Sequence, residues 1–169
     1  MRPFAVSVAD IHHRPGARRR EHLRAGLSDL HVLDTCVPDR ADVDIDVVLE
    51  AVSDGILATG SATAPWRGEC RRCLKPVGGD VDVDFRELFE AEPTEGETWP
   101  LRHEEVDLEP LVREALLLAL PLAPLCGDDC RGLCPTCGAD RNKGSCDCVP
   151  DDHDPRWAAL DALRTEQES

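Results

Sequence analysis

Apolar and acidic residues alternate one by one in two segments of the chain, 42–47 (DVDIDV) and 80–85 (DVDVDF). Successive side chains of a strand point to opposite faces of a sheet, so this period of two predicts strands with one buried face and one wet, acidic face. Asp54-Gly55 suits a tight turn, and a further strand is predicted from about 56 to 66. The last strand continues to about 89. The segment 42–89 is therefore predicted to be an antiparallel meander.

The period changes to that of a helix between residues 107 and 120. Asp107 can cap this helix, Pro110 is acceptable in its first turn, and Pro121 ends it. The apolar residues form a broad stripe that we expect to cover one face of the sheet. The stripe consists of Leu108, Leu111, Val112, Ala115, Leu116 and Ala119, widened by Leu117, Leu118 and Leu120.

The remaining segments complete an α+β fold. Residues 3–8 are predicted to form a short strand, residues 11–24 a basic arm of irregular structure, and residues 90–105 an acidic, exposed linker. Residues 1–120 would then form a core in which the Leu-rich helix covers an antiparallel β-meander or small barrel-like sheet. Residues 121–169 are predicted to form a Cys-rich zinc-binding segment that ends in a short helix starting at Asp154-Pro155.

The charge is acidic but unevenly distributed. The formal net charge is −15, yet residues 1–24 hold six Arg against Asp10 and Glu21, a net of +4. The rest of the chain has 13 cations against 32 anions, a net of −19. Such a chain is not a generic binder of phosphate backbones, and any RNA contact must be local. The candidates for that contact are Arg18, Arg19, Arg20, Arg67, Arg71, Arg72 and Lys75. Alternatively, the arm is a solvated loop and the other cations offset thiolate charge.

No secretory signal is visible after Met1, and we expect a cytoplasmic protein. The longest apolar stretch, 115–126, is interrupted by Pro121 and Pro124 and falls short of the roughly 18 residues of a membrane span. In a reducing compartment, the nine cysteines are more often metal ligands or redox groups than disulfides.

Eight of the nine cysteines fall into two groups, a Cys-x-x-Cys turn at Cys70 and Cys73 and six thiols between residues 126 and 148. Four thiolates complete one structural zinc site, so eight predict two zinc ions. Cys134, Cys137, Cys146 and Cys148 can close one site by themselves. That leaves Cys70, Cys73, Cys126 and Cys130 for the other site, which would clip the hairpin to the end of the long helix. Other partitions of the eight remain open.

The other metal-binding and catalytic residue types give weaker signals. Cys36 is predicted to be a small core residue, and the six histidines to be surface residues. The H-x-E of His103 to Glu105 with the downstream Cys-x-x-Cys superficially resembles zinc deaminases, but the flanking residues do not fit. Dithiol redox chemistry and an iron–sulfur cluster are compatible with thiols, although the spacing favours zinc.

Several motifs, in their order, resemble the YceD family of large ribosomal RNA subunit accumulation proteins. They are Thr63-Ala64-Pro65, residues 68–74 (GECRRCL), Asp107-Leu108 at the start of a Leu-rich helix that runs into Leu120-Pro121-Leu122, the cysteines from Cys126 to Cys148, and Asp154-Pro155-Arg156-Trp157. The resemblance implies a cytoplasmic role in accumulation of 23S rRNA. It also implies a gene often found beside that of a small zinc-ribbon ribosomal protein. No catalytic residue is carried over, because none is known for the family.

The sequence and the resemblance together favour a non-enzymatic, zinc-stabilised factor for large ribosomal subunit biogenesis that supports 23S rRNA accumulation or processing. Its expected partner is the precursor large subunit, contacted through 23S rRNA, a basic ribosomal protein or both, with no membrane and no small-molecule substrate. The alternative is a metal-dependent or dithiol redox enzyme that acts on RNA or a thiol substrate.

Overall fold

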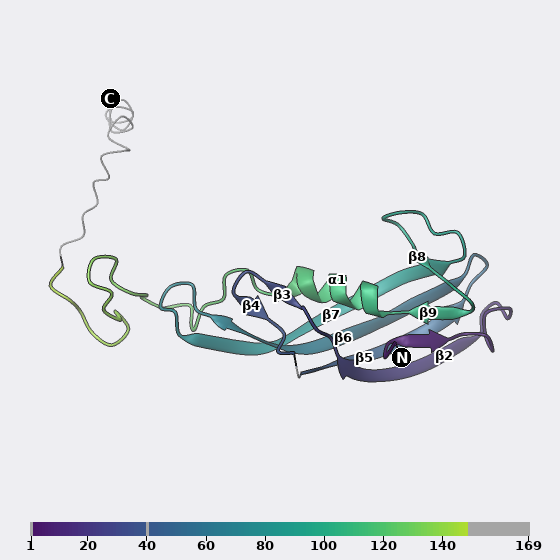
Figure 1. The fold of residues 1–169 in the computed structure, drawn as a ribbon, viewed down its shortest axis with the longest axis horizontal. Helices are drawn as coiled ribbons and strands as arrows, with labels where there is room; N and C mark the ends of the chain where they lie inside the picture. The colour runs from purple at the N-terminus through teal and green to yellow at the C-terminus, as the bar shows by residue number, and fades with distance from the viewer. Residues whose placement is uncertain (1, 40, 149–169) are drawn as a thin grey trace, which may run out of the picture.

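The computed structural model describes residues 2–39 and 41–148. Figure 1 shows a long, twisted sheet with α1 and the β1–β9 pair over the same face. The elements are β1 (Ala5–Ser7), β2 (Arg18–Gly26), β3 (His31–Val32), β4 (Thr35–Cys36), β5 (Asp42–Ala51), β6 (Ile56–Glu69), β7 (Pro76–Glu90), β8 (Trp99–Pro100), β9 (Glu105–Asp107) and α1 (Glu109–Ala119).

The predicted antiparallel meander is present as β5, β6 and β7. β5 pairs with β6 as far as Ala51 opposite Ile56, and β6 pairs with β7 from Ile56 opposite Phe89 to Glu69 opposite Pro76. The sheet does not close into a barrel, because β2 and β7 lie at opposite edges and do not pair within the described residues. The outcome is an α+β fold with an open, mostly antiparallel sheet.

The basic arm is not irregular throughout, which corrects the prediction for residues 11–24. β2 pairs with β5 from Arg18 opposite Glu50 to Gly26 opposite Asp42. Arg18 Nη2 lies 3.0 Å from a Glu50 carboxylate oxygen, and Arg24 Nε lies 3.0 Å from Asp42 Oδ2. Opposite charges on neighbouring strands stabilise the pairing, so the cations that made this segment look like a loop help to hold it as a strand.

Helix α1 covers the sheet as predicted, but with a narrower apolar stripe. Leu111, Val112 and Leu116 are buried, whereas Leu118 is 80% exposed. The Asp107 carboxylate accepts a hydrogen bond from the Glu109 backbone N–H at 3.2 Å. The helix ends at Ala119, before Pro121, which lacks a backbone donor.

The acidic linker at 90–105 is partly structured. Trp99–Pro100 forms β8 and pairs in parallel with the end of β7, and the half-buried Trp99 packs on the core. Arg102 and Glu105 close a two-residue hairpin loop before β9. The short helix predicted from Asp154 lies outside the described residues.

One core lies between the sheet and the layer formed by α1 and the β1–β9 pair. It includes Phe4, which precedes β1, Val106 of β9, Ile45 and Phe89 from the sheet, and Leu116 from α1. We call residues 2–39, 41–69 and 76–119 the sheet body. Residues 70–75, at the β6–β7 turn, and 120–148 form the cysteine-rich end.

Candidate metal centres

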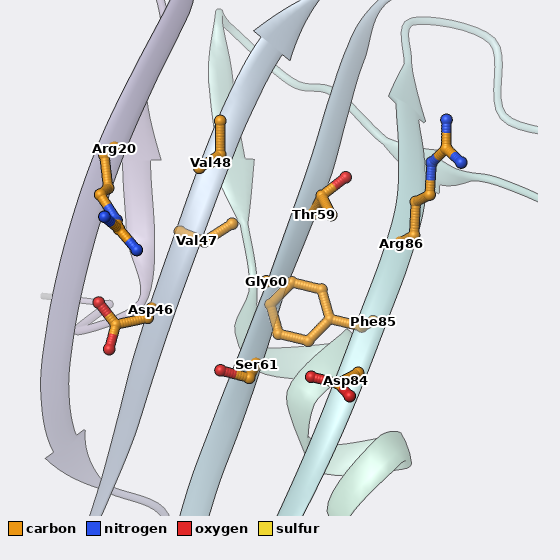
Figure 2. Close-up of a pocket in the computed structure, with 10 residues that line it drawn as sticks. All are labelled: Arg20, Asp46, Val47, Val48, Thr59, Gly60, Ser61, Asp84, Phe85 and Arg86. Atoms are coloured by element: carbon orange, nitrogen blue, oxygen red, sulfur yellow. The ribbon is translucent and has the colours of Figure 1, made fainter.

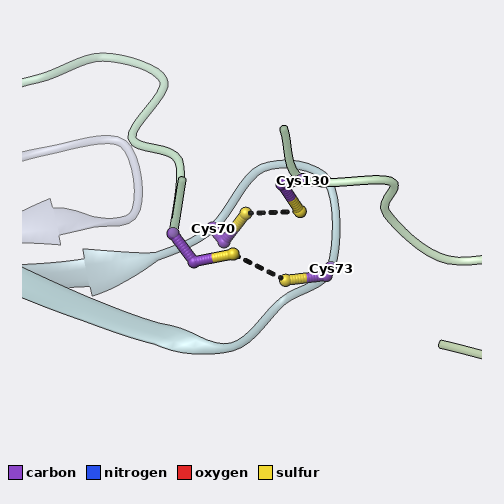
Figure 3. Close-up of side chains that lie close together, drawn as sticks. Cys70, Cys73 and Cys130 are labelled. Carbon is purple, nitrogen blue, oxygen red and sulfur yellow. Dashed lines mark hydrogen bonds between the residues drawn. The ribbon is translucent and has the colours of Figure 1, made fainter. Parts of the chain in front are cut away.

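Four thiols converge where the tip of the β6–β7 hairpin meets the segment that follows α1. Cys70 Sγ lies 3.7 Å from Cys130 Sγ (Figure 3). Cys73 Sγ lies 3.5 Å from Cys126 Sγ. Thiolates about 2.3 Å from a tetrahedral zinc ion lie about 3.7 Å apart, so these spacings fit one metal ion. We call this set the first thiol group, and its four sulfurs lie within 4.8 Å of one another.

Local backbone geometry positions these thiols. The Leu74 N–H donates to the Cys70 carbonyl at 2.8 Å, and Leu74 has a φ of 59°, so the chain turns tightly between the two cysteines of the hairpin. The Arg71 N–H donates to the Pro124 carbonyl at 2.9 Å. This bond ties the hairpin tip to the segment that carries Cys126, as the sequence predicted for the end of the helix.

The second thiol group consists of Cys134, Cys137, Cys146 and Cys148, whose sulfurs also lie within 4.8 Å of one another. Gly138 has a φ of +73°, and its N–H donates to the Cys134 carbonyl at 2.9 Å. This is the permissive residue expected after a metal knuckle. Cys134 is buried and Cys137 is exposed. The structure thus assembles the cysteines in the two sets that the spacing favoured.

Each group contains one thiol that ionises readily and one that does not. Burial opposes ionisation of Cys70, but hydrogen bonds from backbone N–H groups, that of Arg72 foremost, lower its pKa to about 6. Backbone N–H groups of Cys137 and Thr136 lower the pKa of Cys134 to about 6. The thiol of Cys130 raises the pKa of Cys126 to about 12, and that of Cys137 raises the pKa of Cys148 to about 12.

A divalent cation bound by the four sulfurs of a group would favour ionisation of all four thiols, because attraction to the metal would replace the repulsion among the thiolates. Sets of four thiolates with no water-binding position are typical of structural zinc sites. The donor chemistry of both groups therefore fits Zn²⁺, with four protein ligands for each ion.

The two thiol groups are joined by direct contacts. Lys75 Nζ lies 3.0 Å from Asp140 Oδ2, and Asn142 Nδ2 donates to Cys130 Sγ at 3.7 Å. Gly132 lies at the junction with a φ of +72°, and a Cβ on it would lie 2.8 Å from the Arg72 carbonyl oxygen. Such contacts around metal ligands orient them, so the groups form one connected unit.

The other predicted residues fall in different places. Cys36 is half-buried rather than a core residue, because β4 lies beside the end of β6 and Arg67 Nε donates to Cys36 Sγ at 3.5 Å. Glu104 of the H-x-E segment lies beside His12 and His13, in a group of potential ligands that contains no cysteine. Sequence reasoning missed this group, because its members are 91 residues apart along the chain.

Most candidate RNA-contacting cations already have partners. Arg19 Nη1 lies 2.6 Å from Asp10 Oδ1, and Arg72 Nη1 donates to the Cys130 carbonyl at 2.9 Å. Arg18, Arg67 and Lys75 make the contacts given above. Within the described residues, Arg20 and Arg71 have no hydrogen bond or ion pair through their side chains. Both are exposed.

The sheet face opposite α1, here called the open face, carries a shallow hollow of about 530 Å³. Figure 2 shows Asp46 of β5, Ser61 of β6 and Asp84 of β7 side by side on this face, with Arg20 and Arg86 at its sides. Asp80, Asp82 and Asp84 form an exposed column along β7. Thr63 Oγ1 donates to Asp82 at 2.6 Å, and none of the three has an ion pair within the described residues.

A family model described as large ribosomal RNA subunit accumulation protein YceD matches residues 58–164. The chain belongs to the YceD family. The match begins in β6 and includes both thiol groups. The YceD family is named for accumulation of the large ribosomal RNA subunit, and its name describes accumulation factors rather than enzymes.

Individual relatives match between three quarters and nearly the whole of the chain. An uncharacterised protein of Mycobacterium tuberculosis is 38% identical over 180 residues, covering 94% of this chain and 80% of its own. One from Mycobacterium leprae is 37% identical and covers 94% of this chain and 76% of its own. The chloroplastic YCED homolog 1 of Arabidopsis thaliana is 24% identical, and the alignment covers 75% of this chain and 49% of the homolog. No solved structure matches the chain.

The described residues contain no helix that is long and apolar enough to cross a membrane.

Proposed function

We propose that this YceD-family protein is a cytoplasmic, non-enzymatic factor that supports 23S rRNA accumulation and assembly of the large ribosomal subunit, with two structural zinc ions. The observation that carries the proposal is the family match over residues 58–164, because the family is named for large ribosomal RNA subunit accumulation. The matched segment also contains both groups of four thiols. The zinc ions would fix the hairpin tip and residues 124–148 in one arrangement and present it to a partner.

The distribution of charge supports a basic ribosomal protein as one contact on the precursor subunit. The column of Asp80, Asp82 and Asp84 is exposed and has no ion pair within the described residues, whereas three acidic residues of β5, namely Asp42, Asp44 and Glu50, form ion pairs with arginines of β2. Unpaired charge of one sign attracts a partner of the other sign and raises the association rate. The β7 side of the open face is therefore the favoured surface for a basic partner.

Contact with rRNA would be restricted to a few cations. Arg71 is the best placed, because it is exposed on the hairpin tip between two thiols and its side chain has no partner within the described residues. Arg72 is a poor probe of RNA binding, since its guanidinium holds the Cys130 carbonyl at 2.9 Å. Charge reversal at Arg72 would disturb the metal centre as well as any RNA contact.

Depletion of the protein tests the proposal directly. We expect a lower ratio of 23S to 16S rRNA and fewer large subunits, restored by the wild-type gene. Arg71→Glu should weaken co-sedimentation with precursor large subunits without loss of zinc. Arg102→Glu, an exposed charge reversal in the loop before β9 and away from both the hairpin tip and the open face, is the matched control. Unchanged rRNA levels and subunit ratios after depletion would refute the proposed process.

One observation favours a second function, a dithiol redox enzyme. The pKa values of Cys70 and Cys134 are lowered to about 6, and thiols with low pKa values are typical of redox motifs. Metal analysis of protein purified without added zinc separates the two functions. About two zinc ions per chain, released only on unfolding, support the scaffold. A disulfide that forms and is reduced reversibly at native metal content would support the enzyme.

A further inference from the structure

A cluster of two histidines and one carboxylate lies outside both thiol groups. β1 pairs with β9 in antiparallel fashion, with Ser7 opposite Glu105. The segment that follows β1 therefore lies beside the segment that precedes β9. This topology brings His12 and His13 to Glu104 from positions far apart in the sequence.

The distances within the cluster resemble those of a metal site. His13 Nε2 lies 2.9 Å from Glu104 Oε1, and His12 Nδ1 lies 3.8 Å from the same oxygen. All three ligand atoms lie within 4.8 Å of one another. Nitrogen and oxygen ligands at 2.0–2.2 Å from a tetrahedral zinc ion lie roughly 3.3 Å apart, so small side-chain rotations suffice to close the site.

His12 Nδ1 supplies a second, independent observation. This nitrogen is buried and has no hydrogen-bond partner within the described residues. Buried polar atoms nearly always have a partner, and an unpaired one calls for an explanation. A cation held between His12, His13 and Glu104 would provide that partner, because Nδ1 lies on the side of the ring that approaches Glu104.

The turn that carries Glu104 has an unusual sequence for its shape. Glu105 N–H donates to the Arg102 carbonyl at 2.9 Å, and the two intervening residues, His103 and Glu104, have φ values of 51° and 56°. A two-residue hairpin loop with both residues in the left-handed region strongly favours Asn-Gly. The backbone is nevertheless held here, with the Val8 N–H donating to the Glu104 carbonyl at 2.7 Å. The hairpin thus presents a carboxylate where the turn alone would select glycine.

We propose that His12 Nδ1, His13 Nε2 and Glu104 Oε1 bind one divalent transition-metal ion of the zinc class. Two imidazoles and one carboxylate are a donor set that zinc, cobalt and nickel accept, and three protein ligands leave a position for water or a partner's side chain. His13 is 76% exposed, so this ion exchanges more readily than ions held by the thiol groups. The inference is independent of the proposed role in subunit assembly.

Titration of the zinc-loaded, full-length protein with further Zn²⁺ tests this site. Nitrogen-15 NMR measures the chemical shifts of the ring nitrogens of all six histidines during the titration. We expect the His12 Nδ1 and His13 Nε2 signals to shift together and saturate with one added equivalent, while calorimetry counts the same equivalent. A mild chelator should reverse the shift without loss of thiol-bound zinc. Because the histidine signals report this site alone, the result does not depend on how much metal the thiol groups hold.

His13→Ala and Glu104→Gln should each weaken this binding by at least about tenfold, since even outer-shell partners of metal sites contribute that much. His22→Ala is the matched control, because His22 also lies near carboxylates, 3.8 Å from Asp44 and 3.5 Å from Asp46, but has no second histidine. Circular dichroism without added metal verifies that each variant folds. The proposal is overturned if His12 and His13 do not shift together, or if Glu104→Gln binds as tightly as wild type.

Discussion

The sheet body and the cysteine-rich end are stabilised by different forces. The sheet body buries a continuous core of aliphatic and aromatic side chains between the sheet and α1. In the described part of the cysteine-rich end, the buried cluster consists of Cys70, Cys73 and Cys130, and the apolar residues packed against it are Leu125, Leu133 and the neighbouring Val77 of β7. So little apolar surface cannot offset the entropy of ordering a segment of this length. We therefore expect the sheet body to fold on hydrophobic burial, and the cysteine-rich end to fold only with bound metal.

Among the changes considered, metal removal should have the largest effect on structure, and it should unfold the cysteine-rich end while the sheet body stays folded. With a strong chelator and a reductant, we expect residues 70–75 and 124–148 to lose protection from hydrogen exchange, because thiolates without metal repel one another. The strands of the sheet body should keep theirs.

A matched pair of cysteine variants sharpens this experiment. Cys130→Ser removes a buried ligand of the first thiol group and should lower the zinc content measured by metal analysis. Cys36→Ser, outside both groups, should leave it unchanged. Equal zinc content in the two variants would contradict the assignment of Cys130 as a ligand.

A substitution in the hydrophobic core should destabilise the sheet body without changing zinc binding at the cysteine-rich end. Leu116 is fully buried between α1 and the sheet, so Leu116→Ala should lower the free energy of unfolding by about 2–5 kcal/mol. Leu118→Ala, two residues further along the same helix, should change it by less than about 0.5 kcal/mol, because Leu118 is 80% exposed. Chemical denaturation measures both. Zinc content should stay the same in each variant, and its loss in Leu116→Ala would show that the two regions are not independent.

The sequence allowed the meander and the second thiol group to be predicted, because both are local patterns. The first thiol group joins cysteines 53 to 60 residues apart, and it could be predicted only as the four cysteines that the second group leaves over. The alternation at 42–47 and 80–85 has the period of a strand, and the two cysteines of a Cys-x-x-Cys turn lie close enough to bind the same metal ion. Strand β2 was missed, because its cations and the preceding Pro15-Gly16 resemble a loop until Glu50 and Asp42 are seen opposite them. The His12–His13–Glu104 cluster follows only from the pairing of β1 with β9.

The smallest effect that we expect is a change in zinc affinity when the ion pair between the two thiol groups is removed. Lys75 extends from the first group to Asp140 beside the second, and this partner, with the amide of Asn142, lowers the pKa of Asp140 to about 2. The Lys75 side chain is 43% exposed, and exposed ion pairs contribute little. Asp140→Asn should therefore weaken zinc binding by at most about tenfold, the lower end of the range for residues around a metal site.

The pH dependence distinguishes this ion pair from the thiols. A carboxylate with a lowered pKa contributes fully above its usual value of 3.8, and its contribution is lost only as the pH falls toward 2. The difference in zinc affinity between Asp140→Asn and wild type should thus stay constant between about pH 5 and pH 8, although both affinities fall as thiols become protonated. Competition with a chromophoric chelator between about pH 5 and pH 8 measures the zinc affinity of each protein. Asp129→Asn, the same substitution at an exposed aspartate, is the control. A difference that grows toward pH 8 would mean that Asp140 acts through the ionisation of the cysteines rather than through Lys75.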